Sequence, residues 1–432
     1  MSARIVRPAE GLVGSARLPG DKSISHRLAI LGAIAQGPTE LVNYSPGRDC
    51  ASTLDCLRAL GVRITLEDAG GAPKVTLEGR GLGGLEPPAG ELDAGNSGST
   101  LRMLAGVLAA HPFESVLTGD ASLRRRPVRR VIEPLEQMGA TLEAREGEFP
   151  PLRIRGTSLK PIDYVMPVAS AQVKTAVLLA GLHAPGTTSV EEPMRTRDHT
   201  EIALEAFGAS VTRERRRVTV RGQTPLRGAQ FIIPNDLSAA AFFLVAGLLL
   251  PKTNLVLPQV SLDPTRAALL DFLLPQGAQI KVLDVETQQG ELRGNLHVRG
   301  GGALKGGVID GALTANLIDE LPVLAVLGTQ TEDGLRIRDA AELRVKESDR
   351  LHAIAENLRR LGARVEEHPD GLDIPGRQRL RGAAISSFGD HRIAMAMAVA
   401  GLVAEGETTI EDADCVEISF PGFFVVLQAL LE

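Results

Sequence analysis

The chain has 432 residues, of which 44% are hydrophobic, 23% charged and 3% aromatic, and its formal net charge at pH 7 is −6. This composition excludes wholesale disorder, and the acidic balance with few aromatic side chains argues against general binding of nucleic acid or anionic membranes. Three cysteines, an N-terminus without the apolar core of a signal peptide, and a longest apolar run of 12 residues (239–250) predict a cytoplasmic protein without a disulfide framework.

Two kinds of segment alternate along the chain after strand-like stretches at 3–11 and 14–20. The first kind is a polar turn that opens onto a small-residue apolar helix, at 20–35, 95–109, 168–182, 234–250, 314–328 and 389–404. The second kind is an amphipathic helix that ends at a glycine and is followed by two strands, with the glycines at Gly61, Gly139, Gly208, Gly277 and Gly362. Glycine at this place is the usual left-handed terminator of a helix.

The first kind occurs six times and the second five times, and the chain ends in a helix-like stretch (421–432). We therefore predict six βαβαββ-like units, with the N-terminal strands completing the last one. Three units make a domain of ordinary size. The predicted domains are residues 20–235 and residues 1–19 plus 236–432.

Polar residues gather where the apolar helices begin. Helix N-termini expose free backbone N–H groups and a positive dipole end, which suits anions. The alternative is that these residues are ordinary helix caps. The residues in question are Lys22, Ser23, Arg27, Asn96, Gly98, Ser170, Gln172, Lys174, Asp236, Asp319, Glu320, Asp390, His391 and Arg392.

Three further segments are rich in charge: 122–130, 191–201 (with Arg195, Arg197, Asp198 and His199) and 342–351. In the last of these, a helix would place Lys346 and Arg350 on one face. Arginine forks suit carboxylates and phosphates, and the interspersed acids suit proton transfer. A solvated salt-bridged helix is the alternative for 342–351. The sequence has no HxH or HxxxH pair and no GxxxxGK[ST] loop, so we expect no metal and no nucleotide.

Seven motifs in this order resemble the 5-enolpyruvylshikimate-3-phosphate synthase family, in its class II bacterial form, over essentially the whole chain. They are DKSISHR (21–27), GNSGSTLR (95–102), RRPV (125–128), SAQVKTA (170–176), TRDHTE (196–201), LRVKESDR (343–350) and GDHR (389–392). The resemblance implies a two-domain inside-out α/β barrel with the active site in the interdomain cleft. It also implies transfer of enolpyruvyl from phosphoenolpyruvate to shikimate 3-phosphate on the pathway to chorismate, no cofactor, a monomer, and glyphosate binding in the phosphoenolpyruvate site.

The same resemblance assigns the site residue by residue. Asp319 is implied as the base for the 5-hydroxyl, with Glu347, Lys22 and Lys346 as the groups that share the remaining proton transfer. The residues implied to bind shikimate 3-phosphate are Lys22, Ser23, Arg27, Ser170, Gln172, Arg197, Asp319 and Lys346. Those implied to bind phosphoenolpyruvate are Lys22, Asn96, Gly98, Arg126, Gln172, Arg350, His391 and Arg392.

One position departs from the family pattern, because Ile418 stands where many relatives have a lysine near the C-terminus. Two other functions remain as alternatives. The sister enzyme that uses UDP-N-acetylglucosamine usually carries a cysteine shortly before the Arg-Pro pair, and residues 119–127 contain none. A nucleic-acid-binding module would use the basic runs 122–130 and 214–218.

Overall fold

The computed structural model describes residues 3–69 and 72–431, so residues 1, 2 and 432 of the predicted second domain lie outside it. The chain folds into two compact units. The N-unit comprises residues 20–233 together with the short stretch 288–291, and the C-unit comprises residues up to 19, 234–287 and 292 onward. The predicted boundary after residue 235 differs from this division by two residues.

Three repeats of one supersecondary pattern build the N-unit. The first contains α1 (Lys22–Ile34), β3 (Gln36–Val42), α2 (Arg48–Ala59), β4 (Arg63–Ala69), β5 (Ala72–Arg80) and β6 (Leu92–Asp93). The second contains α3 (Gly98–Leu108), β7 (Glu114–Thr118), α4 (Arg129–Gln137), β8 (Thr141–Arg145), β9 (Phe149–Arg155) and β10 (Asp163–Val165). The third contains α5 (Ala171–Gly181), β11 (Thr187–Glu191), α6 (His199–Ala206), β12 (Val211–Glu214), β13 (Arg217–Arg221) and β14 (Gln230–Ile232).

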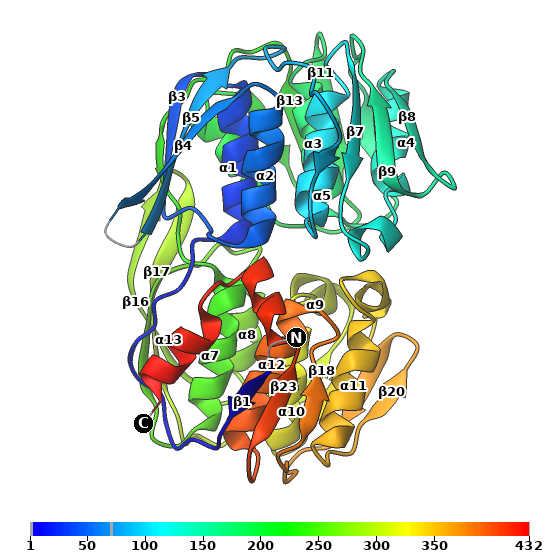
Figure 1. Ribbon diagram of the computed structural model, residues 1–432. Helices are drawn as coiled ribbons and strands as arrows, with labels where there is room; N and C mark the ends of the chain where they lie inside the picture. Colours follow the sequence, from blue (N-terminus) through cyan, green and yellow to red (C-terminus); the bar gives the residue numbers. More distant parts are fainter. Residues whose placement is uncertain (1–2, 70–71, 432) are drawn as a thin grey trace. The chain divides into compact units, whose positions relative to one another are not determined.

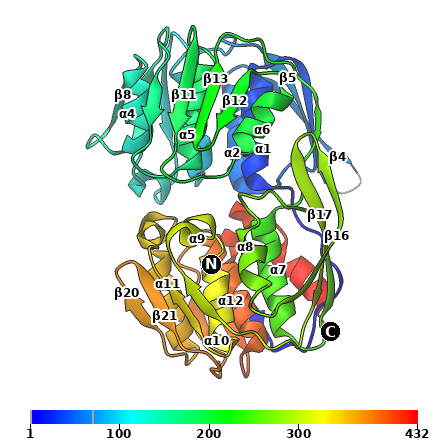
Figure 2. The ribbon, with the colours of Figure 1, turned by 180° about the vertical axis from the view of Figure 1, so that it is seen from behind.

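The last strand of each repeat in the N-unit belongs to the sheet of another repeat. The sheet orders are β14-β3-β5-β4, β6-β7-β9-β8 and β10-β11-β13-β12. This last strand pairs in parallel with the first strand of the other repeat, and the remaining strand pairs are antiparallel. Because β14 pairs with β3, the third repeat is joined to the first. Figure 1 shows α1, α3 and α5 inside this unit, and Figure 2 shows its third sheet from behind.

The C-unit repeats the same pattern. Its elements are β1 (Arg4–Val6), β2 (Val13–Ser15), α7 (Leu237–Leu249), β15 (Asn254–Ser261), α8 (Ala268–Leu273), β16 (Gln279–Gln288), β17 (Glu291–Arg299), β18 (Gly307–Ile309), α9 (Gly311–Asn316), α10 (Leu321–Gln330), β19 (Leu335–Ile337), α11 (Arg350–Arg360), β20 (Glu366–His368), β21 (Gly371–Ile374), β22 (Ala384–Ser386), α12 (His391–Val403), β23 (Thr408–Glu411) and α13 (Phe423–Leu430). Its sheets are β16-β17-β15-β2, β18-β19-β21-β20 and β1-β23-β22.

The N-terminal strand completes the last unit, as predicted, because β1 pairs with β23. The α/β fold with six repeated units is also confirmed. Among the described residues the six sheets are separate and none closes into a barrel. The polar turn predicted to open onto an apolar helix within 314–328 is confirmed, because residues 317–320 form a turn and α10 begins at Leu321; the short helix α9, which ends at Asn316, was not predicted. Asp319 lies in this turn, as predicted.

Buried helices form the core of each unit. Residues 391–402 of α12 and 237–248 of α7 are all buried, and α1, α3, α5 and α10 are nearly so. Each unit has one continuous hydrophobic cluster of its own. A helix that is apolar on every side must be enclosed, so the sheets and the outer helices cover it. In the described part of the chain, no helix is both long and apolar enough to span a membrane.

Two sets of glycines make this packing possible. The five predicted helix terminators all have φ between +86° and +111°, where only glycine is unstrained. Five others lie at the end of the second strand of a hairpin or just after it: Gly79, Gly156, Gly222, Gly300 and Gly376. A Cβ atom on any of these would lie 1.8 to 2.3 Å from a backbone carbonyl oxygen at the end of the preceding apolar helix. The repeated glycines therefore allow the sheets to approach the helix ends.

Candidate active site

In the N-unit, the three apolar helices begin at side-chain caps. Asp21 accepts a hydrogen bond from the backbone N–H of Ile24 at 2.9 Å. Ser97 caps α3 and Ser170 caps α5 in the same way. Each cap satisfies one or two N–H groups of the first turn, and the positive end of the helix dipole remains.

Some of the residues predicted to hold shikimate 3-phosphate, Lys22, Ser23 and Arg197, form a first group in the N-unit, whereas Asp319 and Lys346 belong to the C-unit. The guanidinium of Arg197 donates to Ser23 Oγ at 3.3 Å. Lys22, with 16% of its side chain exposed, forms an ion pair with the buried Asp49 at 3.0 Å. The structure thus joins the start of α1 to the segment that precedes α6, although 174 residues separate Ser23 from Arg197.

Arg27 lies behind this group. It is 4% exposed and donates to the Thr200 hydroxyl at 2.7 Å, to the Ser23 carbonyl oxygen at 2.8 Å and to the Thr175 hydroxyl at 3.1 Å. Burial, and then the nearby Arg197, lower the pKa of Arg27 to about 10. These contacts show that Arg27 fixes the first turn of α1 from the interior.

The residues predicted to border phosphoenolpyruvate form the second group in the N-unit. Arg126 donates to Asn96 Oδ1 at 2.7 Å and to Ser122 Oγ at 3.0 Å. Gln172 at the start of α5 donates to Ser99 Oγ in α3 at 2.9 Å. Gly98 is buried as the first residue of α3. The first turns of α3 and α5 therefore lie together beside the Arg126 loop.

Arg102 belongs to this second group, and sequence reasoning gave it no role. Its two terminal nitrogens donate to Gln172 Oε1 at 3.0 Å and to the Pro127 carbonyl oxygen at 3.0 Å. A Cβ atom on Gly98 would lie 2.5 Å from Arg102 Nη1. The signal was present in the GNSGSTLR motif, where a cation sits four residues after Gly98, one helical turn along the same face.

The C-unit contains the third group, which is built around Arg350. This side chain is 1% exposed and donates to Asp390 at 2.7 and 3.2 Å and to Glu347 at 2.6 Å. Its Nη1 lies 3.6 Å from Asp319. Burial disfavours the charged guanidinium, but Asp390 and Glu347 outweigh that effect and raise the pKa of Arg350.

Two further cations of the C-unit lie near Asp319. Arg392 donates to the Asp319 carbonyl oxygen at 2.9 Å, and its Nη2 lies 3.7 Å from the carboxylate. Burial lowers the pKa of Lys346, whereas Asp319 opposes the shift. Asp319 therefore lies within the influence of three cations.

The prediction that Lys346 and Arg350 share a helix face is wrong. A short 3-10 helix ends at Val345, and α11 begins only at Arg350, with Asp349 as its cap. Glu347 still reaches Arg350, because the turn before the helix brings the two side chains together. His391, the first residue of α12, is buried next to Asp390.

Two carboxylates in these groups make contacts that the sequence did not predict. Asp49 pairs with Lys22 from the first turn of α2. Asp390 caps α12 through the N–H of Arg392 at 2.9 Å and also binds Arg350. No spacing in the sequence predicted either pairing, because each joins residues far apart in the chain.

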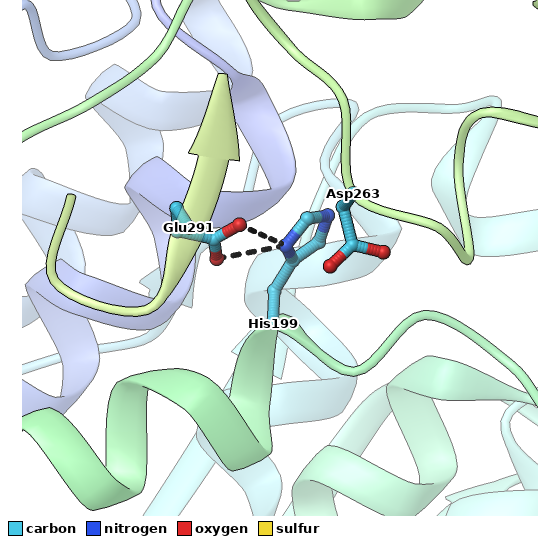
Figure 3. A group of neighbouring side chains, drawn as sticks. All are labelled: His199, Asp263 and Glu291. Atoms are coloured by element: carbon cyan, nitrogen blue, oxygen red, sulfur yellow. Dashed lines mark hydrogen bonds and ion pairs between the residues drawn. The ribbon is translucent and has the colours of Figure 1, made fainter. Parts of the chain in front are cut away.

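Groups that resemble metal ligands have other partners. Glu366, His368 and Asp373 lie close together in the C-unit, but Asp373 also pairs with Arg338 at 2.7 Å, and this cation competes with a metal ion. His199 Nδ1 lies 2.9 and 3.1 Å from the two carboxylate oxygens of Glu291 (Figure 3). The His199–Glu291 pair holds the first residue of α6 in place.

In chemical terms, the N-unit offers cations and helix N-termini, and the C-unit offers three carboxylates with three cations. The first set suits phosphate and carboxylate groups. The second set suits proton transfer beside a developing charge, because an acid and a base are held close to fixed positive groups.

Comparisons with known proteins agree with this chemistry. The family model of EPSP synthase (3-phosphoshikimate 1-carboxyvinyltransferase) matches residues 6–427. A 3-phosphoshikimate 1-carboxyvinyltransferase of Solibacter usitatus is 55% identical over 427 residues, with 99% of each chain covered. A protein of the same name from Bacillus cereus is 48% identical over 432 residues, with 100% of each chain covered.

Solved structures give the same result for the fold. The EPSP synthase of Acinetobacter baumannii has a TM-score of 0.86 at 39% identity and covers 99% of this chain and 98% of its own. The enolpyruvyl transferase NikO of Streptomyces tendae, at 18% identity with a TM-score of 0.79, covers 99% of this chain and 96% of its own and shares the fold. The chain thus belongs to the EPSP synthase (3-phosphoshikimate 1-carboxyvinyltransferase) family.

Proposed function

We propose that the chain transfers the enolpyruvyl group of phosphoenolpyruvate to the 5-hydroxyl of shikimate 3-phosphate, with release of phosphate, and that its three residue groups act on this one substrate pair. The reaction belongs to the shikimate pathway, which leads to chorismate and the aromatic amino acids. The observation that carries the proposal is the C-unit group, in which Asp319 and Glu347 flank the buried Arg350.

Shikimate 3-phosphate is assigned to the first group of the N-unit. Arg197, Ser23 and the cap residue Ser170 offer a cation and two hydroxyls for the phosphate. Because Arg197 and Ser23 already lie 3.3 Å apart, a phosphate oxygen that accepts from both requires little rearrangement. Lys22 and Gln172 are assigned to contacts with both substrates.

Phosphoenolpyruvate is assigned to the second group of the N-unit and to the cations of the C-unit. Asn96, Gly98 and Arg126 border it from the N-unit. Arg350, His391 and Arg392 bind its carboxylate and phosphate from the C-unit. Arg350 Nη1 is buried and has no hydrogen-bond partner among the described residues, so it has N–H groups to offer a carboxylate.

The atom balance of the proposed reaction shows which protons must be transferred. The 5-hydroxyl loses a proton as its oxygen bonds to the central carbon of phosphoenolpyruvate, and the methylene carbon gains one. The C–O bond to phosphate then breaks, and the methyl group gives a proton back, because the product keeps the enol double bond. Asp319 is assigned to the hydroxyl proton.

The group that serves the methylene carbon is one of Glu347, Lys346 and Lys22. The 2.6 Å contact with Arg350 favours the ionised form of Glu347, which suits acceptance of a proton from the methyl group. Burial lowers the pKa of Lys346, which makes its ammonium group a better proton donor than that of an exposed lysine. Variants of each residue separate these assignments.

The test is release of inorganic phosphate from phosphoenolpyruvate by the purified chain. We expect release with shikimate 3-phosphate as acceptor and none with UDP-N-acetylglucosamine or without an acceptor. Release that depends on UDP-N-acetylglucosamine would refute the proposal in favour of the sister activity. Tight binding of DNA at physiological salt without phosphate release would favour a nucleic-acid-binding module.

We propose further that the enzyme is a monomer and works in the cytoplasm. The monomer follows the family resemblance, and free thiols at Cys50, Cys56 and Cys415 suit a reducing compartment. Light scattering at micromolar concentration should give one chain mass of 45.7 kDa. Twice that mass would contradict the monomer.

A further inference from the structure

Lys174 is a buried cation that the proposed reaction does not use. It lies in α5, and its ammonium group forms ion pairs with Glu201 at 2.7 Å and with Glu192 at 3.0 Å. The three side chains are only 1–2% exposed. Burial raises the pKa of Glu201, whereas Lys174 opposes that shift.

The two carboxylates stand at the two ends of the segment that bears Arg197. Glu192 directly follows β11, and Glu201 lies in the first turn of α6, so the stretch 193–198 is connected to Lys174 at both ends. Within that stretch the Thr196 hydroxyl donates to Glu192. Lys174 therefore contacts a residue at each end of this short segment.

Neighbouring contacts connect this cluster to the proposed phosphate site. Thr175, next to Lys174, shares a hydrogen bond of 2.6 Å with Thr200, next to Glu201. Both hydroxyls accept from Arg27, which also supports Ser23. The first residue of α6 is held separately by the His199–Glu291 pair (Figure 3).

Packing alone does not account for three charges in this interior. Apolar residues of similar volume often stabilise a protein as well as a buried ion cluster does, because desolvation of the ions is costly. What the charges add is a fixed position, since both carboxylates must lie within hydrogen-bond distance of the same ammonium group. The cluster is well suited to hold a loop whose position matters.

We propose that Lys174 is a positioning residue. Together with Glu192 and Glu201 it fixes the segment 193–198, so that Arg197 meets the phosphate of shikimate 3-phosphate and the enzyme selects this substrate over unphosphorylated shikimate. The inference rests on the proposed function and on the assignment of Arg197 within it.

The test removes all three charges at once, so that no unpaired charge remains buried. The variant is Lys174→Met combined with Glu192→Gln and Glu201→Gln. We expect the KM for shikimate 3-phosphate to rise about 10- to 100-fold, which corresponds to a lost hydrogen bond between charged groups. The KM for phosphoenolpyruvate should change less than about twofold, within the range of substitutions that touch no key contact.

A second readout separates positioning from a merely structural role. The ratio of kcat/KM for shikimate 3-phosphate to that for shikimate should fall in the triple variant and in Arg197→Met, and should not change in Lys160→Met. Lys160 is an exposed lysine of the same unit and makes the matched control. Loss of stability with an unchanged ratio would overturn the proposal.

Two further outcomes keep the inference distinct from the proposed function. If Arg197→Met leaves the KM for shikimate 3-phosphate unchanged, the assigned phosphate site is wrong. If Arg197→Met raises that KM and the folded triple variant does not, only the role of Lys174 fails. Should the triple variant not fold, the single change Glu192→Gln decides, because it leaves Lys174 paired with Glu201 and should still raise the KM for shikimate 3-phosphate.

Discussion

Replacement of Glu347 by glutamine tests the centre of the proposed chemistry. The change keeps the shape of the side chain and removes its charge and its capacity to exchange a proton. We expect kcat to fall by about 10²- to 10⁴-fold, the usual contribution of one general acid or base. This corresponds to about 3–5 kcal/mol of activation free energy.

The contacts of Glu347 determine how much the same variant lowers the free energy of unfolding. Glu347 accepts from Arg350 at 2.6 Å with 14% of its side chain exposed, so the variant weakens one buried charged hydrogen bond. Arg350 keeps both contacts with Asp390, so its charge does not become unpaired. We expect the free energy of unfolding to fall by about 1–3 kcal/mol, the range for a hydrogen bond to a charged group.

The assay combines phosphate release with calorimetric binding of shikimate 3-phosphate. Binding should stay within a few-fold of the original while turnover collapses. The matched control is Asp349→Asn two residues away, since asparagine still caps α11 and, among the described residues, the native side chain pairs only with Arg344 and the helix N-terminus. Turnover of Glu347→Gln within about threefold of the control would refute a proton-transfer role, because general acid–base groups contribute far more.

Four other changes have defined outcomes. Lys22→Ala should raise both KM values and lower kcat in steady-state kinetics, and intact kinetics would overturn its assignment to both substrates. Gly98→Ala should raise the inhibition constant of glyphosate more than the KM of phosphoenolpyruvate, and parallel changes would contradict this. Burial lowers the pKa of Lys346, so the alkaline limb of kcat/KM should lie below pH 10.5 and move to higher pH in Lys346→Arg; an unmoved limb would assign it to another group. Gly156→Ala should lower the free energy of unfolding by at least about 1–3 kcal/mol, the cost of overpacking, whereas Gly90→Ala, which has open space, should not.

Much of the fold was predictable because it repeats. Helices that are apolar on every side must be buried, and a glycine after an amphipathic helix marks its left-handed end, so six units could be counted from the sequence alone. The missing strands at the C-terminus predicted that the N-terminus would complete the last unit. The turn before α10 was predicted, but the short helix α9 in front of it was not, because its six residues carry no apolar periodicity.

The sequence named candidate site residues but not the contacts between them. Motifs named Arg126, Arg197 and Arg350 one by one, since each carries the resemblance in a short stretch of sequence. They gave no reason to pair Lys22 with Asp49, or Gln172 with Arg102.

What the sequence determined by itself is therefore local and periodic: helix starts, glycine stops and the kinds of charge at each turn. What only the tertiary structure decided is which charges neutralise one another. Lys174 illustrates the difference. Its two partners lie 18 and 27 positions further along the chain, and burial rather than spacing makes each pairing strong, because an unpaired charge in the interior would be costly.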